Sequence, residues 1–494
     1  MKLTIKDMNI STGDTLVGII NRKDAEEFDL HALDRVKLKK GSRRETIFLD
    51  IAESNMVPKG KIGLVEEVLK SLKAKRGDKI DMVPKRKPES LTYIKKKLDG
   101  SSLKKEEINQ IVWDIVHNQL SHIELTYFVS ACYTHALSLE ETVFLTKAMA
   151  SEGETLHLKS KIVMDKHCVG GVAGNRTTMV VVPIIAAAGL KIPKTSSRSI
   201  TSPAGTADTM EVLANVDVSL NNMGRIVNKT NGCMIWGGSL NLAPSDDKII
   251  KVEKPLSIDA KSQLLASVMS KKLSVSATHL LIDIPWGKGS KIENKRNALT
   301  LKSNFEKVAK KIGMKVKVLL TDGRTPIGKG IGPVLEARDV MRVLQGHPER
   351  PKDLYEKSIK ITGHMLELAG KKNSKALAKS LLDSGKALDK MKEIIKAQGK
   401  KALDGEKLKL GKFKREIKAS RSGKVKAVLN HVISKIARTA GCPKNHTAGI
   451  YLDVKLGDRV KKGDTLYTIY AVSNFKLRYA VSIAKELGLG IEIR

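Results

Sequence analysis

The sequence has 494 residues, enough for two to four domains that each bury a core of their own. Its 41% hydrophobic and 29% charged residues indicate a soluble globular protein. No uninterrupted apolar stretch reaches the roughly 18 residues of a membrane span, and residues 1–9 contain no apolar core of a secretory signal. We therefore expect a cytoplasmic protein without a membrane partner.

Cysteine usage points to the same compartment. The four cysteines, Cys132, Cys168, Cys233 and Cys442, are scattered and show no Cys-x-x-Cys spacing. This pattern is typical of a reducing cytoplasm and argues against a disulfide scaffold or a zinc ribbon. We expect no metal site.

The positive charge leaves one alternative function open. Subtracting 53 acidic from 89 basic residues gives a formal net charge of +36, which would attract polyanions, as in a nucleic-acid-binding protein. However, the lysines are spread along the chain, only seven Phe and eight Tyr could stack on bases, and no zinc-finger or RNA-recognition signature occurs. We expect no specific nucleic-acid partner and interpret the charge as steering of an anionic substrate.

The first 85 residues alternate short apolar runs with turns, which predicts a small β-rich domain. Residues 45–51 and 78–83 are expected strands, whereas residues 62–69 have the spacing of an amphipathic helix. A basic linker at 84–88 follows.

A helical block is expected over about 86–160. Apolar residues recur at helical spacing between 108 and 115. Ser121 and Ser138 each stand three residues before a glutamate, the pattern of a capping box that opens a helix.

An α/β region begins near residue 161 and carries a first candidate anion loop. A short strand at 161–164 precedes the glycine-rich loop 165–176, and an apolar helix follows at 179–188. A loop between a strand and a helix N-terminus presents backbone N–H groups that bind anions.

Residues 194–211 form a second candidate anion loop. Gly205 lets the backbone approach a ligand closely, and a helix-like stretch at 210–213 is expected to place a helix N-terminus nearby. The hydroxyls and cations of this loop are Lys194, Ser196, Ser197, Arg198, Ser199, Thr201, Ser202 and Thr206. A polar surface loop with a helix N-cap is the alternative interpretation, but two such loops in one α/β region favour a substrate with two phosphates.

The rest of the chain adds elements to this framework. The expected strands are 215–219, 232–236 and 280–285, the expected helices are 297–312 and 366–399, and a basic connection at 400–420 leads to a small α+β domain. The glycine-rich segments at 286–291 and 328–332 lack the spacing of a P-loop or a dinucleotide fingerprint, which argues against a kinase or a dehydrogenase.

Several motifs together resemble one family. Lys-His-x-x-Gly-Gly-Val begins at Lys166, and Ser-Ser-Arg is followed by Ala-Gly-Thr-Ala-Asp-x-x-Glu, which ends at Glu211. Further matching segments are 256–260, 266–273, 321–328, 448–453 and 456–464. In order and spacing the chain resembles the thymidine and pyrimidine-nucleoside phosphorylase family and, within it, the archaeal-type nucleoside monophosphate (AMP) phosphorylases.

The resemblance implies a fold and an activity. It implies a multidomain α/β and α+β protein, with a β-rich barrel-like domain (1–85), a helical lobe (86–160, with later helices), an α/β domain (161–410) and a small C-terminal α+β domain (420–494). The implied enzyme is a pentosyltransferase that converts AMP, and by extension CMP and UMP, with phosphate into free base and ribose 1,5-bisphosphate. A pyrimidine-nucleoside phosphorylase is the alternative. Inorganic phosphate is a co-substrate, no cofactor is expected, and a homodimer or larger homo-oligomer is implied.

The resemblance also assigns site residues. Asp259 matches the proton donor to the leaving base, a role that a carboxylic acid with a raised pKa can fill; a helix N-cap is the alternative for this residue. The matching nucleotide contacts are Gly171, Ser197, Arg198, Ser199, Ile200, Thr201, Ser202, Thr206, Ser267 and Lys291. Positions around the phosphate and base of the nucleoside enzymes match Lys166, Thr177, Ser196 and Lys271.

Three departures from the nucleoside enzymes point toward a monophosphate substrate. Val252 stands where those enzymes carry an arginine that reads the pyrimidine, and Ser-Ser-Arg-Ser at 196–199 replaces Ser-Gly-Arg-Gly, which adds hydroxyls. Cys168 replaces a serine that contacts phosphate in those enzymes.

Overall fold

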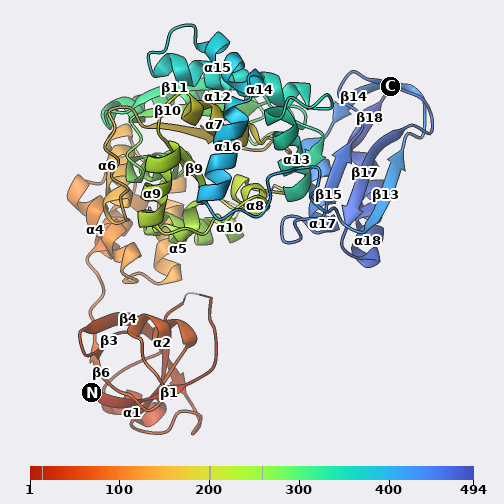
Figure 1. Ribbon diagram of the computed structural model, residues 1–494. Coiled ribbons are helices and arrows are strands. Elements are labelled where there is room, and N and C mark those ends of the chain that lie inside the picture. Colours follow the sequence, from red (N-terminus) through yellow and green to blue (C-terminus); the bar gives the residue numbers. More distant parts are fainter. Residues whose placement is uncertain (14, 200–201, 257, 259) are drawn as a thin grey trace. The chain divides into compact units, whose positions relative to one another are not determined.

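The computed structural model describes residues 1–13, 15–199, 202–256, 258 and 260–494 (Figure 1). It divides into two compact units. The first comprises Met1–Glu152 and Ala243–Ser267, and the second comprises Gly153–Leu242 and Val268–Arg494. Among the described residues, no helix combines the length and the apolar character that crossing a membrane requires.

A closed six-stranded barrel forms the N-terminal part of the first unit, with the strand order β1-β5-β2-β4-β3-β6. Its elements are β1 (Lys2–Asp7), β2 (Val17–Asn21), α1 (Arg22–Glu27), β3 (Arg35–Lys40), β4 (Arg43–Ala52), β5 (Lys61–Leu64), α2 (Glu66–Leu72) and β6 (Lys79–Pro84). The inward side chains, Ile20, Val36, Leu38, Ile47 and Leu49 among them, are fully buried. The β-rich domain expected from the sequence is therefore present.

The helix expected over 62–69 is wrong in its first half. Residues 61–64 form β5, which pairs with β1 on one side and with β2 on the other. Ile62 and Leu64 point into the barrel and are fully buried, and the helix starts only at Glu66. A closed barrel requires a strand at this place. The apolar spacing of residues 62–69 fits both a strand and a helix, so pairing with the neighbouring strands determines which of the two forms.

Five helices make up the rest of the first unit: α3 (Ser90–Leu98), α4 (Lys105–Val116), α5 (His122–Thr134), α6 (Leu139–Ser151) and α10 (Pro244–Leu256). Both expected capping boxes are confirmed, because Ser121 and Ser138 accept the backbone N–H groups of Glu124 and Glu141. Arg35 of the barrel donates from Nε to the carbonyl oxygen of Gln119 at 3.0 Å, which links the barrel to the helical lobe.

The second unit is built around parallel strands. β11 (Lys315–Asp322), β10 (His279–Trp286) and β7 (Met164–Cys168) form one sheet, and β8 (Ile192–Ser196) pairs with β9 (Gly232–Trp236). A parallel bridge between Val163 and Lys191 connects the two groups. The helices of this part are α7 (Thr177–Ala187), α8 (Thr206–Glu211), α9 (Leu220–Thr230), α12 (Lys295–Lys311), α13 (Pro333–Leu344), α14 (Lys352–Leu368), α15 (Ser374–Asp383) and α16 (Lys386–Ala397), and α11 (Lys261–Ser274) enters it from the first unit.

The strand expected at 215–219 is not formed. Val216 and Val218 are both buried, as in a strand, but the side chain of Asn215 accepts the N–H of Asp217 and donates to its carbonyl oxygen, each at 3.0 Å. This local side-chain turn replaces a sheet ladder.

The C-terminal part of the second unit contains two small sheets, β12-β15-β17-β13 and β16-β14-β18, packed with two helices. Its elements are β12 (Gly330–Ile331), β13 (Phe413–Lys418), β14 (Gly423–Val428), α17 (Asn430–Ala440), β15 (Gly449–Leu452), β16 (Arg459–Val460), β17 (Thr465–Ala471), α18 (Asn474–Glu486) and β18 (Ile491–Ile493). The expected connection at 400–420 thus already contains a strand, β13. β12, which follows the α/β strands in sequence, pairs with β15 and joins the two parts.

Candidate active site

The candidate site lies where the parallel strands end. The loops 169–176, 197–205, 287–291 and 323–329 follow the carboxyl ends of β7, β8, β10 and β11. Because these strands are parallel, their carboxyl ends share one edge, and this edge is where open α/β sheets bind ligands.

The loop after β7 is shaped by glycine. Gly170, Gly171 and Gly174 have φ angles of +95°, +87° and +68°, which side chains rarely adopt. A Cβ atom on Gly171 would lie 2.2 Å from the backbone nitrogen of Lys291. The first loop therefore packs directly against the loop after β10.

Lys166 lies beneath this loop, on β7, and is 1% exposed. Its Nζ donates to the hydroxyls of Thr177 and Thr178, at 3.1 and 3.2 Å, in the first turn of α7. Burial lowers the pKa of Lys166, and the nearby Lys357 and Arg176 add to this effect. An ammonium has three donors, so Lys166 can bind one more acceptor, such as an anion at the α7 N-terminus.

The loop after β8 is folded onto the start of α8. One carboxylate oxygen of Asp208 accepts the N–H groups of Ser199 and Gly205, each at 2.7 Å. A Cβ atom on Gly205 would lie 2.4 Å from the carbonyl oxygen of Ser197. The hydroxyl groups of Ser199 and Ser202 also bond within the loop.

Arg198 is held in one orientation. It donates two hydrogen bonds to Glu211, at 2.6 and 2.8 Å, and its guanidinium lies over the ring of Trp236 at 4.8 Å from the centroid. The bond to Glu211 raises the pKa of Arg198, and the same bond lowers the pKa of Glu211. Such a fixed, charged donor is suited to a phosphate or a carboxylate.

Arg176 joins the two loops. From the end of the first loop it donates to the Thr206 hydroxyl at 3.2 Å and to the carbonyl oxygen of Ala204, both in the second. It also pairs with Glu336, whose side chain is fully buried. Glu336 in turn accepts the Thr209 hydroxyl at 3.0 Å and the Gly332 N–H at 3.1 Å.

A second buried carboxylate, Asp283, lies on β10 in the same parallel sheet as Lys166. It accepts the Thr321 hydroxyl at 2.6 Å and pairs with Lys357 of α14 at 3.1 Å. Burial opposes its ionisation, but Lys357 and Lys166 outweigh burial and hold the pKa of Asp283 below its usual value. The Cys168 thiol donates to Asp283 at 3.6 Å, and burial raises the pKa of this thiol, so the residue that replaces a serine is a neutral hydrogen-bond donor.

Six of the residues expected in the site lie in these loops: Gly171, Ser197, Arg198, Ser199, Ser202 and Lys291. Lys166 and Ser196 lie on the strands that precede the loops, Thr177 and Thr206 begin the helices that follow, and Lys271 lies on α11; all of these residues belong to the second unit. Ser267 lies on α11 and is the last residue of the first unit. The expected contacts Ile200 and Thr201 and the expected acid Asp259 lie outside the described residues.

The sequence alone did not indicate the groups that hold the loops in place. In the sequence, Arg176 is only the last residue of a glycine loop, and Asp283 is only part of an apolar strand. A usable signal is a charged residue inside a buried strand, because such a residue needs a partner or a function.

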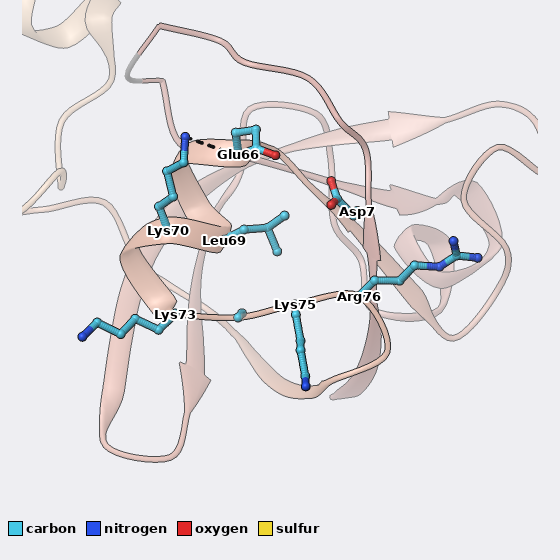
Figure 2. Close-up of a pocket in the computed structure, with 8 residues that line it drawn as sticks. Asp7, Glu66, Leu69, Lys70, Lys73, Lys75 and Arg76 are labelled. Atoms are coloured by element: carbon cyan, nitrogen blue, oxygen red, sulfur yellow. Dashed lines mark ion pairs between the residues drawn. The ribbon is translucent and has the colours of Figure 1, made fainter.

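A depression on the N-terminal barrel does not form a comparable site. It is lined by Asp7, Glu66, Leu69, Lys70, Lys73, Ala74, Lys75 and Arg76. Figure 2 shows that Lys73, Lys75 and Arg76 point in different directions and that Lys70 turns to Glu66, with which it pairs at 3.3 Å. Its cations therefore do not converge on one anion.

Three family models match the chain and define its class. Residues 91–153 match the helical bundle domain of a glycosyl transferase family, and residues 160–388 match the a/b domain of that family. Residues 424–487 match the pyrimidine nucleoside phosphorylase C-terminal domain. These matches define the chain as a glycosyltransferase.

Several known proteins are similar to this chain over nearly its whole length, and they define its family more closely. The AMP phosphorylases of Pyrococcus furiosus and Methanocaldococcus jannaschii are 44% and 43% identical to this chain over 491 residues, which is 99% of this chain and 97% and 96% of theirs. A candidate thymidine phosphorylase of Legionella pneumophila is 42% identical over 98% of this chain and 94% of its own. The chain belongs to the AMP and thymidine phosphorylase family.

A solved structure supports the fold alone. Anthranilate phosphoribosyltransferase from Thermus thermophilus matches with a TM-score of 0.54 at 16% identity, over 62% of this chain and 98% of its own.

Proposed function

We propose that this protein cleaves nucleoside 5′-monophosphates, AMP above all, with inorganic phosphate, and releases the free base and ribose 1,5-bisphosphate. The proposal is supported by the similarity to AMP phosphorylases along nearly the entire chain. The observation that carries it is the contact through Arg176 between the loops 169–176 and 197–205, both of which we propose to bind anions. A nucleotide and a phosphate together need two anion-binding sites.

The proposed reaction is a substitution at the anomeric carbon. An oxygen of inorganic phosphate forms a bond to C1 of the ribose while the bond from C1 to the base nitrogen breaks. The electron pair of that bond goes to the base, which takes a proton from Asp259. Holding phosphate beside C1 makes the attack effectively intramolecular, and the negative charge of phosphate stabilises the oxocarbenium-like transition state.

The residues that we assign to the substrate are those expected from the sequence. They are Gly171, Ser197, Arg198, Ser199, Ile200, Thr201, Ser202, Thr206, Ser267 and Lys291, with Lys166, Thr177, Ser196 and Lys271 around the phosphate and base. Lys166 and the α7 N-terminus are suited to one anion, and Arg198 to another. The reaction needs no cofactor, because phosphate is itself the nucleophile.

The base preference follows from an apolar substitution. Val252, on α10, packs against the core of the helical lobe instead of offering the bidentate donor of an arginine. A site without that donor is not committed to a pyrimidine, so we assign AMP as the preferred substrate and include CMP and UMP. The setting is nucleotide catabolism in the cytoplasm, and the assembly is a homodimer or larger homo-oligomer.

A substrate panel tests the proposal. Purified protein is incubated with phosphate and with AMP, CMP, UMP, adenosine, thymidine or uridine, and free base is quantified by chromatography. We expect AMP to give the highest kcat/KM and adenosine to react at least ~100-fold more slowly, since loss of charged hydrogen bonds to one phosphate costs about 3 kcal/mol or more. Faster cleavage of thymidine or uridine would instead identify a pyrimidine-nucleoside phosphorylase, and salt-sensitive RNA binding without base release would favour a nucleic-acid-binding protein.

A further inference from the structure

A second group of buried charges lies on the other face of β7 from Lys166. Successive side chains of a strand point to opposite faces, so Asp165 points away from α7. Asp165 is fully buried, and Lys272 of α11 lies 2.7 Å from one of its carboxylate oxygens. Lys194 of β8 lies 3.9 Å from the other oxygen.

Among the residues that the structure describes, this cluster holds more positive than negative charge. Two ammonium groups surround one carboxylate, and the side chains of Lys194 and Lys272 are only 7% and 4% exposed. Burial, and then the neighbouring Lys272, lower the pKa of Lys194 to about 7, whereas Asp165 raises it. Burying a cation without a full counter-charge is costly unless another anion offsets it.

Lys194 stands where β8 turns into the second anion loop. Its Nζ donates to the carbonyl oxygen of Thr195, the residue directly before Ser196. Ser196 lies on the same face of β8 as Lys194, because the two residues are two apart. Within the described part of the chain, the buried Ser196 hydroxyl oxygen has no hydrogen-bond partner.

We propose that Lys194 is a positioning residue for the substrate anion. Paired with Asp165 and next to the like-charged Lys272, it lies at the strand end that carries Ser196 and Ser197, and its incompletely compensated charge strengthens the binding of a phosphoryl group at these two residues. The inference rests on the proposed phosphorolysis. It adds a residue that strengthens anion binding at the second loop. A purely structural ion cluster is the alternative, and it makes the opposite prediction for stability.

Stability separates these two roles. Replacing Lys194 by methionine leaves one cation, Lys272, opposite one anion, Asp165, and removes the most poorly compensated charge. We therefore expect Lys194→Met to melt at the same temperature as the wild type or above it. A structural cluster would predict a clear loss of stability or failure to fold, and either result would overturn the inference.

Binding is measured without turnover, by calorimetric titration of the full-length protein with AMP and, separately, with inorganic phosphate. We expect Lys194→Met to weaken binding of at least one of the two ligands by ~10-fold or more, because a poorly screened positive charge near the bound anion is removed. Lys194→Arg, which keeps the charge, should bind within ~3-fold of the wild type. Lys191→Met is the matched control, because the Lys191 ammonium bonds the Asn228 side chain at the surface.

Kinetics give the second readout. The Lys194→Met enzyme should show a raised KM for the affected ligand, while kcat stays within ~3-fold, as expected when a uniform binding contribution is lost. Unchanged binding and KM in a folded Lys194→Met variant would refute the role of Lys194. If the wild type binds AMP and phosphate but releases no base, the proposed function fails, whereas the binding comparison still decides the role of Lys194.

Discussion

Arg176 donates a hydrogen bond to the hydroxyl of Thr206 at 3.2 Å, and this contact joins two loops that leave different strands. The same guanidinium is bound to the buried carboxylate of Glu336 on α13. Within the described residues, Arg176 and its counter-ion therefore help to fix the relative position of the two loops.

Replacing Arg176 by methionine should damage both stability and catalysis. The variant leaves Glu336 buried without its cation, which costs about 3–5 kcal/mol of unfolding free energy. The link between the loops is also lost, so kcat/KM for AMP should fall by ~100-fold or more. Thermal melting and steady-state kinetics measure the two effects.

A double variant separates the two effects. Arg176→Met combined with Glu336→Gln removes both charges; the glutamine oxygen can still accept the Gly332 N–H, and its amide group can donate to the Thr209 hydroxyl oxygen. We expect it to recover much of the lost stability but little of the lost activity. Recovery of activity together with stability would show that the pair serves folding alone. Arg225→Met, on the exposed part of α9, is the control and should change neither quantity.

The close approach of Gly171 to Lys291 predicts that alanine lowers activity more at Gly171 than at the neighbouring Gly170. Gly170 and Gly171 both have positive φ angles, but of the two only a Cβ atom on Gly171 would have an atom of the described residues within 4 Å. Alanine at either position costs about 1–2 kcal/mol of backbone strain, whereas Gly171→Ala must also push the Lys291 loop away. We expect kcat/KM for AMP to be at least ~10-fold lower in Gly171→Ala than in Gly170→Ala. Equal activities would mean that this close approach does not position the site.

Secondary structure could be predicted where the spacing of apolar residues fits either a helix or a strand, but not both. The apolar faces of α4 and α7 and the buried runs of β9 and β10 lie at the expected residues. The predictions of a helix at 62–69 and of a strand at 215–219 were wrong for a shared reason. In both, apolar residues alternate or recur at spacings that fit more than one structure, and the outcome depends on partners elsewhere or on a single side chain such as Asn215.

Asp259 is the residue that we propose to protonate the leaving base. If it is the general acid, Asp259→Asn should lower kcat for AMP by ~100-fold or more with little change in phosphate affinity, because only the protonation of the leaving base is lost. The exposed Asp217 provides the matched control, and Asp217→Asn should leave kcat unchanged. Turnover close to that of the wild type would assign Asp259 to a helix cap.

A pH effect on stability is expected from Asp339, which lies in α13. Its carboxylate accepts the N–H groups of Lys329 and Gly330, each at 2.7 Å, and burial raises its pKa from 3.8 to about 6. Between these two values the folded state binds more protons than the unfolded state, so this contribution is fully present below about pH 4 and is lost as pH rises through about 6. At pH 7 the loss amounts to about 3 kcal/mol.

Asp339→Asn keeps an acceptor oxygen and removes the ionisation. The difference in urea unfolding free energy between variant and wild type should therefore shift in favour of the variant between pH 4 and pH 7, while the contributions of all other groups cancel. A difference that is constant with pH, or that shifts in favour of the wild type, would contradict the raised pKa.

For the candidate site, the sequence proposes a set of residues whose roles stay a prediction, and it does not predict how these residues are arranged. Hydroxyls, glycines and cations concentrated in two segments indicated anion binding, and these segments do adjoin. The partners that hold them could not be predicted, because Arg176 and Glu336 are separated by 160 positions and Cys168 and Asp283 by 115. Sequence shows that a buried charge needs a partner, but only the fold identifies that partner.

We propose that one edge of the α/β sheet holds two anions at once. This can be tested by a crystal structure of the full-length protein with AMP and sulfate. We expect the AMP phosphate and the sulfate on the two different loops, with Gly171, Arg198 and Thr206 among the contacts of the nucleotide. A nucleotide that touches none of these three residues, with the two loops separated, would contradict it.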